Sequence, residues 1–285
     1  MRENIENAQA AIDYIESHLH ENLGLERVAD AVHYSKYHLH RMFADTVGMT
    51  IHDYVQRRRL TEAAKLLVLS GKPILEIALI AGYESQQAFS DSFKTMYKKS
   101  PGQYRVEKEF YPLLLRYRLK DIPAHSPEDS WQDAIAPATN EDIPVWLSLT
   151  RLVIDGFPHW DEKQYLEQLR QAIQNRRAWI LKDAGAAIGV MAFDEITGNI
   201  DFLGVHPQYR KLGIAKAFCK KALYELARAG HISVTTFREG DKADPGCREV
   251  FKSLGFSEAE LLVEFGYPTQ RFILWKEESE GTGHE

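Results

Sequence analysis

Apolar residues recur at helical spacing through the first part of the chain. Positions i, i+3, i+4 and i+7 lie on one face of a helix, so an apolar stripe at this spacing predicts an amphipathic helix. The first such stripe consists of Ile5, Ala8, Ile12, Ile15 and Leu19. Similar patterns continue to about residue 105, with one long helix predicted over residues 51–69. The N-terminal part is therefore predicted to be all-helical.

This helical pattern contains one unit twice. A shift of 50 positions carries Ser35 onto Ser85 and Phe43 onto Phe93. Each copy is predicted to have a short helix, a tight turn and a second helix that begins at a capping serine. This is the layout of a helix-turn-helix, with the long helix joining the two copies. An ordinary helical bundle would show similar apolar spacing, so the spacing alone leaves both alternatives open.

The pattern changes after about residue 106. Short β-like runs then alternate with helical ones, which predicts an α/β or α+β domain. The predicted strands are residues 179–181, 187–193, 200–205, 232–237, 261–265 and 271–275. The predicted helices of this region are residues 213–228 and 247–254.

A turn-rich stretch at residues 123–130 lies between the two patterns and predicts a domain boundary. The predicted organisation is a helical domain (1–108), a linker (109–130), a second domain (131–276) and a disordered tail (277–285).

Composition excludes several classes of protein. The chain has 285 residues, 44% of them hydrophobic, and a formal net charge of −6. It is neither disordered nor fibrous, and it contains no apolar run of the roughly 18 residues that a membrane span requires. The acidic, amphipathic start is untypical of a secretory signal. With only Cys219 and Cys247 as cysteines, we expect a soluble, cytoplasmic protein with no membrane partner.

The charge is unevenly distributed. Residues 31–108 hold 12 basic and 7 acidic side chains, whereas residues 109–285 hold 21 basic and 27 acidic ones. The basic excess coincides with the repeated units, as expected for a protein that neutralises phosphates. Arginine and glutamine match the edges of guanine and adenine, and such residues stand early in the two serine-capped helices. Those candidates are Arg41, Gln86 and Gln87.

Further cations are candidates for phosphate contacts. They are Lys94, Lys98, Lys99 and Arg105. The run Arg57-Arg58-Arg59 is compatible with a phosphate clamp or with a solvated helix face that has Arg59 in an internal salt bridge. His33, His38 and His40 do not share one helix face and have no cysteine near them, so no metal site is expected.

The helical part resembles the AraC/XylS family of bacterial transcription regulators over about residues 8–107, and most closely its MarA/SoxS/Rob subgroup. The motifs that carry this resemblance are residues 34–43, 59–63, 82–89 and 93–105. The resemblance implies a double helix-turn-helix that binds double-stranded operator DNA, with RNA polymerase as a further partner. The implied DNA-binding residues are Lys36, Tyr37, His40, Arg41, Gln86, Gln87, Ser90 and Lys94. Asp91 stands where the subgroup usually has an arginine, and its charge would repel phosphate.

The strongest chemical signal of the second domain is the segment 205–215, at a predicted junction of strand and helix. Small residues at 213 and 215 allow backbone N–H groups to approach a ligand, and a helix N-terminus favours an anion. This domain resembles the GNAT acetyltransferase superfamily over about residues 131–276. The resemblance implies a mixed central sheet and an acetyl-CoA site whose loop holds the pyrophosphate. The implied cofactor-binding residues are Leu203, Val205, Arg210, Lys211, Leu212, Gly213, Ile214 and Ala215.

The second motif of this superfamily is altered. Asp244, Cys247 and Phe251 stand where many active members have asparagine, alanine and tyrosine. That tyrosine commonly protonates the leaving thiolate, and phenylalanine lacks the hydroxyl to do so.

Other residues are candidates for the catalytic roles. Asp201 is the candidate base, with Asp194 and Glu195 as alternatives, and Tyr267 is the candidate acid. A solvated strand edge is the competing interpretation of the three carboxylates. Phe157 and Trp160 are candidate substrate contacts, in a helical segment (150–175) that the resemblance implies. Packing in the core is the competing interpretation of these aromatic residues.

The sequence therefore predicts a sequence-specific transcription regulator whose second domain binds acetyl-CoA as a sensor or transfers its acetyl group to a small amine. A bifunctional, active N-acetyltransferase with a DNA-binding module is the alternative. A small amine or metabolite is the expected effector.

Overall fold

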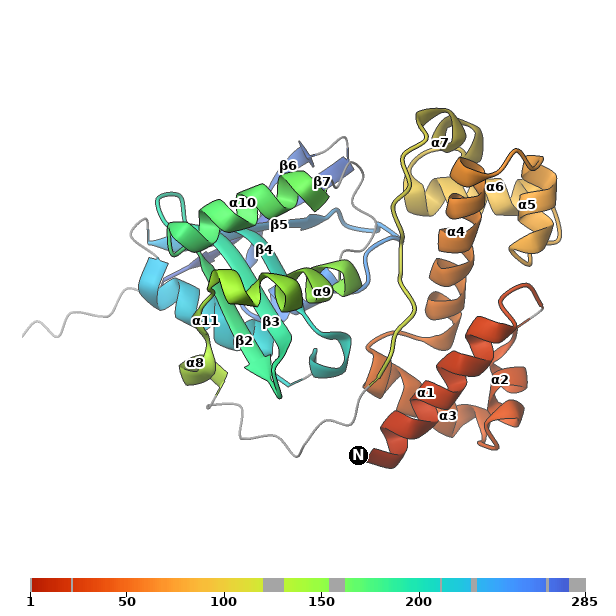
Figure 1. Cartoon of the computed structure of the whole chain (residues 1–285), viewed down its shortest axis with the longest axis horizontal. Coiled ribbons are helices and arrows are strands. Elements are labelled where there is room, and N and C mark those ends of the chain that lie inside the picture. The colour runs from red at the N-terminus through yellow and green to blue at the C-terminus, as the bar shows by residue number, and fades with distance from the viewer. Residues whose placement is uncertain are drawn as a thin grey trace, which may run out of the picture.

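Two bodies make up the structure, a helical one and one built on a sheet (Figure 1). The computed structural model describes residues 2–21, 23–119, 131–153, 162–210, 212–226, 230–264 and 267–276. None of the described helices is long and apolar enough to cross a membrane.

The helical domain contains the predicted repeat. Its helices are α1 (Arg2–Ser17), α2 (Leu25–Ala31), α3 (Lys36–Val47), α4 (Ile51–Leu69), α5 (Ile74–Ile80), α6 (Gln86–Tyr97) and α7 (Pro101–Glu107). The pairs α2–α3 and α5–α6 are the two helix-turn-helix units, and α4 joins them (Figure 1). The prediction of an all-helical double helix-turn-helix is confirmed.

Serine side chains cap the starts of α3 and α6, as the sequence predicts, and a glycine ends α3. The hydroxyl oxygens of Ser35 and Ser85 accept hydrogen bonds from the backbone N–H groups of His38 and Ala88 at 3.4 and 3.1 Å. Gly48 ends α3 with φ +83°, a left-handed conformation that glycine adopts without steric cost.

Each helix-turn-helix unit has its own core. One core joins α1, α2, α3 and the first part of α4, and the other joins the rest of α4 with α5, α6 and α7. Residues 111–117 belong to both cores, because Tyr111 and Leu113 pack in the second and Leu114 and Tyr117 in the first. The first part of the predicted linker therefore packs along α4. Residues 120–130 lie outside the described residues, so the predicted domain boundaries remain predictions.

The second domain is a seven-stranded mixed sheet with helices on both faces, which confirms the predicted class. Its strands are β1 (Ala136–Pro137), β2 (Ala178–Asp183), β3 (Ala186–Asp194), β4 (Asn199–Val205), β5 (His231–Phe237), β6 (Ser257–Glu264) and β7 (Tyr267–Trp275). Their order across the sheet is β1-β2-β3-β4-β5-β7-β6. Its helices are α8 (Trp131–Ala134), α9 (Ile143–Val153), α10 (Glu162–Gln174), α11 (Ile214–Leu226), α12 (Cys247–Ser253) and the 3-10 turns η2 (Asn140–Asp142) and η3 (Pro207–Tyr209).

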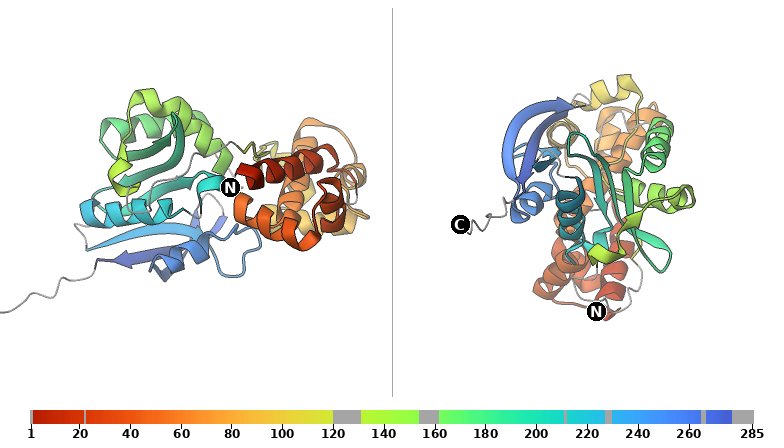
Figure 2. Two further views of the ribbon diagram at one scale, coloured as in Figure 1. Left: turned by 90° about the horizontal axis from the view of Figure 1, so that it is seen from below. Right: turned by 90° about the vertical axis from the view of Figure 1, so that its left-hand side faces the viewer.

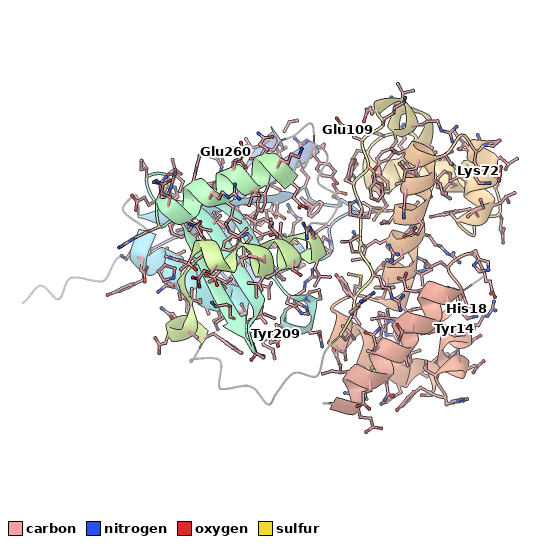
Figure 3. The ribbon with its side chains drawn as sticks, viewed as in Figure 1. Tyr14, His18, Lys72, Glu109, Tyr209 and Glu260 are labelled. Atoms are coloured by element: carbon pink, nitrogen blue, oxygen red, sulfur yellow. The ribbon has the colours of Figure 1, made fainter. Side chains whose placement is uncertain are left out.

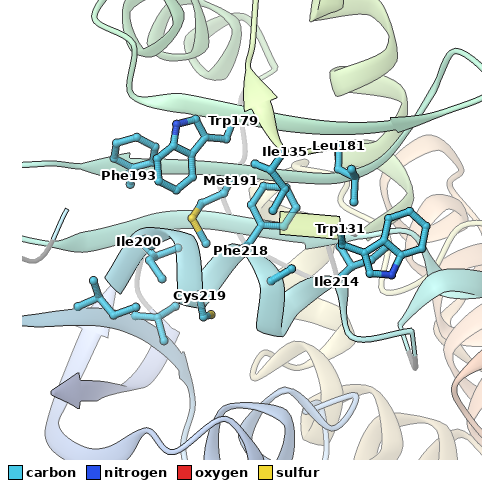
Figure 4. Close-up of a cluster of buried hydrophobic side chains, with 14 of the residues drawn as sticks. Trp131, Ile135, Trp179, Leu181, Met191, Phe193, Ile200, Ile214, Phe218 and Cys219 are labelled. Atoms are coloured by element: carbon cyan, nitrogen blue, oxygen red, sulfur yellow. The ribbon is translucent and has the colours of Figure 1, made fainter. Parts of the chain in front are cut away.

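The two faces of the sheet carry different helices. Figure 2 shows α9 and α10 on one side of the sheet and α11 on the other. Phe218 of α11 is directed toward the strands (Figure 4) and is completely buried. Its neighbour Cys219 is also buried, and burial raises the pKa of this thiol to about 12. Cys219 is therefore a packed, protonated thiol at neutral pH.

One strand pair is parallel, and it is short. The pairing of β4 with β5 joins Asn199 to Ser233 and Ile200 to Val234. Because no pairing of these strands is recorded beyond Ile200 within the described residues, the strands diverge toward their carboxyl ends. The segment η3 and the N-terminus of α11 follow directly from the carboxyl end of β4.

Candidate functional site

The first two turns of α3 expose their polar side chains. Its apolar stripe of Leu39, Met42 and Phe43 is buried, so the opposite face points to solvent. The predicted DNA-binding residues of this helix all lie on the exposed side, and Tyr37 has 79% of its surface exposed. Lys36 also donates to Glu26 Oε1 at 2.9 Å, an exposed pair that a phosphate can replace.

The equivalent turns of α6 are arranged in the same way. Gln86, Gln87 and Lys94 are exposed and Ser90 is half-buried. The Gln87 amide nitrogen donates to both carboxylate oxygens of Asp91, at 2.9 and 3.1 Å. Asp91 therefore occupies the donor side of Gln87 and leaves its amide oxygen available as an acceptor.

The helix that joins the two units sets their separation. The 19 residues of α4 span about 28 Å at 1.5 Å per residue. Successive major-groove segments on one face of a duplex lie about 34 Å apart. The length of α4, which joins the two units, is thus close to the distance between successive major-groove segments.

The three successive arginines of α4 are structural, so both sequence interpretations of this run are wrong. Arg57 and Arg58 are buried, and Arg59 is half-buried. Arg58 binds Glu16 through two hydrogen bonds of 2.7 and 3.0 Å, and Arg59 Nε donates to the carbonyl oxygen of Leu19 at 2.8 Å. The run therefore holds the helices together and offers neither a phosphate clamp nor a solvated face.

Three of the four predicted phosphate-binding cations are already bonded to partners within the protein. Lys98 donates to Asp241 Oδ1 at 2.6 Å, Lys99 pairs with Glu107 at 2.5 Å, and Arg105 donates to the carbonyl oxygen of Lys72 at 2.6 Å. Lys94 is exposed, and the described part of the chain records no ion pair for it. Of the four, Lys94 therefore has the side chain that is available to bind a phosphate.

The predicted pyrophosphate loop lies between η3 and α11. Tyr209 of η3 (Figure 3) donates its hydroxyl proton to Asp183 at 2.7 Å, which fixes the loop to the β2–β3 turn. Gly213 has φ +76°, and α11 begins at the next residue, Ile214. The first N–H groups of a helix have no partner within the helix, so they are available to an anion. Arg210, Leu212 and Ala215 lie in this same turn, whereas Lys211 lies outside the described residues.

The strand before this loop provides the other predicted contacts. Leu203 and Val205 are half-buried on β4, against the core that contains α11. Beyond Ile200 the strand diverges from β5. A left-handed glycine, a helix start and an open strand edge meet at this point. These residues fit the pyrophosphate and pantetheine of acetyl-CoA.

The two predicted catalytic side chains lie at opposite ends of the sheet. Asp201 is four residues before Val205, about 13 Å along a strand, and accepts a hydrogen bond from Asn199 Nδ2 at 2.7 Å. Burial raises the pKa of Asp201. Tyr267 is buried at the start of β7 and donates to Asp241 Oδ2 at 2.8 Å. Burial and the Asp241 carboxylate both raise the pKa of this tyrosine.

The alternative bases do not face the loop either. Asp194 accepts hydrogen bonds from the backbone N–H groups of Thr197 and Ile196, each at 2.9 Å. These bonds lower its pKa and place it in the β3–β4 turn. Glu195 is exposed in the same turn. The predicted substrate contacts Phe157 and Trp160 lie outside the described residues.

The altered second motif has structural roles. Phe251 is buried against Phe256 and Phe272. Asp244 accepts hydrogen bonds from the backbone N–H groups of Gly246 and Cys247 at 2.9 and 2.7 Å, and so orders the start of α12. No hydroxyl stands at the position of the usual tyrosine.

The sequence analysis missed the loop 238–246, which joins the two domains. This loop follows β5 and reaches α4 (Figure 1). Arg57 Nη2 donates to the carbonyl oxygen of Ala243 at 2.9 Å, and Ala243 is buried in the core of the second helix-turn-helix unit. Asp241 accepts from both Lys98 and Tyr267. Lys98 and Asp241 are 143 residues apart in sequence, and Arg57 and Ala243 are 186 apart, so no local pattern could have shown the contact between the domains.

Comparison with known proteins identifies both domains. Residues 28–107 match the family described as "Helix-turn-helix domain", and residues 146–256 match the "Acetyltransferase (GNAT) family". The chain is 40% identical over 95 residues to the multiple antibiotic resistance protein MarA of Salmonella typhimurium, and the match covers 33% of this chain and 75% of MarA. The chain belongs to the AraC-type helix-turn-helix family. Its AraC-type domain, matched over residues 28–107, is fused to a GNAT domain, matched over residues 146–256.

Two longer relatives share the AraC-type domain. The chain is 44% identical over 98 residues to "Uncharacterized HTH-type transcriptional regulator YbfP" of Bacillus subtilis, a match that covers 34% of this chain and 33% of YbfP. It is 39% identical over 116 residues to the transcriptional regulator Rob of Salmonella typhimurium, covering 39% of this chain and 40% of Rob. The chain thus matches two-fifths or less of the length of each of these relatives.

Proposed function

We propose that this AraC-type protein is a cytoplasmic regulator of transcription that reads double-stranded operator DNA through α3 and α6. The observation that carries this proposal is the pair of serine-capped helices, which expose equivalent turns and are joined by α4. The names of YbfP and Rob, both transcriptional regulators, support it. RNA polymerase is the proposed protein partner.

We further propose that the GNAT domain binds acetyl-CoA and acts as a sensor. Arg210, Gly213 and the first turn of α11 would hold the pyrophosphate, and Leu203 and Val205 would lie along the pantetheine. Bound acetyl-CoA supplies an acetyl thioester, whose carbonyl the Val205 N–H would polarise. The sensor is favoured because Phe251 has no hydroxyl and the Tyr267 hydroxyl is bonded to Asp241.

An active N-acetyltransferase with a small amine as acceptor is the second candidate. The Acetyltransferase (GNAT) match over residues 146–256 supports it. Incubation of the protein with acetyl-CoA and a set of small amines separates the two. We expect acetyl-CoA to bind in calorimetry and release of free CoA to stay at the rate without protein. Release above that rate, with an acetylated amine in the mixture, would overturn the sensor and establish the enzyme.

The variant Arg41→Ala tests whether α3 recognises the base sequence of DNA. Selection from a pool of random-sequence duplexes first yields the preferred site. Loss of a bidentate contact to a base edge then costs about 1 to 3 kcal/mol, so we expect affinity for the selected duplex to fall about 5- to 150-fold. Affinity for a scrambled duplex should change much less.

The matched control is Arg116→Ala, which removes an equally charged side chain that pairs with Asp13. It should leave the preference for the selected duplex intact. Equal losses on selected and scrambled duplexes for Arg41→Ala would refute its role in base recognition.

A further inference from the structure

The loop 238–246 of the GNAT domain is bonded to the AraC-type domain at two places. Its Asp241 carboxylate accepts from Lys98 and Tyr267, and its Ala243 carbonyl accepts from Arg57. The backbone N–H of Ala243 donates to Asp241 Oδ1 at 2.9 Å, which fixes the tip of the loop. Figure 2 (left) shows this blue loop between the sheet and the helical domain.

The loop lies against equivalent positions on both recognition helices. The 50-residue shift that relates the two units carries Ala44 onto Lys94 and Gly48 onto Lys98. One recess is lined by Ala44, Gly48 and Thr50 together with Lys242, and a second by Asp91, Lys94 and Lys98 together with Lys242. Lys242 therefore stands between the two helix-turn-helix units and faces each of them.

These positions continue the predicted DNA-reading faces toward the helix ends. On α3, residues 37, 41, 44 and 48 follow one stripe, and on α6 residues 87, 91, 94 and 98 follow the same stripe. A recognition helix contacts base edges with its N-terminal residues. Lys242 lies near the C-terminal ends of both helices, so it leaves their base-reading N-terminal turns open. In a complex it would lie between the two major-groove segments, where the duplex presents its phosphates.

The carboxylates around Lys242 are bonded to other groups, and the described residues record no ion pair for Lys242 itself. Asp241 is paired with Lys98, Asp244 accepts from the backbone of α12, and Asp91 accepts from Gln87. Thr50 donates its hydroxyl proton to Asp53 at 2.7 Å in the first recess. Lys242 and Lys94 are exposed residues that line the second recess.

The acidic residues 1–30 offset the basic excess of the repeated units, so the AraC-type domain has no net charge as a whole. Residues 1–108 hold 14 basic and 14 acidic side chains, and the first unit's Arg41 has Asp91 as its counterpart in the second. A duplex binder gains affinity by neutralising phosphates. Lys242 lines the same recess as Asp91 and supplies a positive charge near the position at which the first unit has Arg41.

We propose that Lys242, a residue of the GNAT domain, contacts a phosphate of the DNA backbone between the two major-groove segments. The proposal rests on the DNA-binding function proposed above. It makes the GNAT domain part of the DNA-binding surface, so that a ligand that moves loop 238–246 would also change the affinity for DNA.

The test is the salt dependence of binding by the full chain. A labelled 30-base-pair duplex of mixed sequence is titrated at several salt concentrations with wild type, Lys242→Ala and Lys220→Ala. Lys220 is an exposed lysine of α11 in the same domain and serves as the control. Loss of one phosphate contact lowers the slope of log affinity against log salt by about 0.9. We expect this change, with an affinity loss of about three- to tenfold, for Lys242→Ala alone.

The outcomes separate this proposal from the general function. A wild-type chain that binds no duplex refutes the DNA-binding function. If wild type binds and Arg41→Ala loses its preferred site while Lys242→Ala matches Lys220→Ala, this inference alone is overturned. Tighter binding by Lys242→Ala also overturns it, because the loop then obstructs the duplex. Unchanged DNA binding with weakened acetyl-CoA binding in calorimetry overturns it too, and assigns the lysine to the nucleotide.

Discussion

Arg58→Ala is expected to lower the free energy of unfolding of the AraC-type domain by about 3 to 5 kcal/mol, because it leaves a buried carboxylate without its partner. Only 7% of the Arg58 side chain and 9% of the Glu16 side chain are exposed. Arg58 also donates to Glu62 and to the carbonyl oxygen of Leu114, each at 2.9 Å. The variant would lose contacts between α1, α4 and the segment that follows α7. Urea unfolding followed by far-ultraviolet circular dichroism measures the loss.

Arg116→Ala is the matched control, since it breaks one arginine–aspartate pair at the surface. The side chains of Arg116 and Asp13 are 46% and 51% exposed, and such pairs contribute about 0 to 1 kcal/mol. Adding Glu16→Gln to Arg58→Ala should recover part of the loss, because a buried neutral amide costs less than a buried carboxylate. Equal losses for the exposed and the buried pair would contradict this account.

Gly213→Glu is expected to weaken acetyl-CoA binding by about 100-fold or more, because it places a carboxylate at the proposed pyrophosphate site. Gly213 has φ +76° at the start of α11. A side chain there is strained by this backbone conformation, and its charge repels the phosphates. Isothermal titration calorimetry of the full chain measures the affinity.

Two further variants separate charge from strain. Gly185→Glu introduces the same side chain at φ +79° in the β2–β3 turn, where a Cβ would meet no atom within 4 Å. It should bind acetyl-CoA like wild type. Gly213→Ala imposes the strain without the charge and should lose less affinity than Gly213→Glu. Unchanged affinity for Gly213→Glu would show that this loop is not the phosphate site.

Local features of the chain were predictable because they depend on neighbours in sequence. Ser35 and Ser85 cap their helices within three residues, and Gly48 ends α3 by its own backbone conformation. The apolar stripes choose the buried face of each helix at a fixed period of 3.6 residues. The same reasoning placed most strands of the second domain within a few residues of their bounds, although β1, α8 and most of α9 were missed.

Roles of charged side chains were predicted poorly, because they depend on what packs against them. Arg57, Arg58 and Arg59 form a basic run in sequence, yet each is bonded to a segment that lies far away along the chain. Lys98 is similar, since the carboxylate that binds it lies 143 positions later. Long-range partners of this kind have no signature within a short window of sequence.

The sequence by itself determined the two domain classes, the doubled helix-turn-helix and the exposed turns of α3 and α6, since caps and apolar periods act over a few residues. Only the tertiary structure decided which cations are available to a ligand and which hold the fold together. It also brought loop 238–246 of the GNAT domain between the two recognition helices, where Asp241 meets Lys98 and Ala243 meets Arg57. The physical reason is that a contact between domains is specified by the packing of both surfaces.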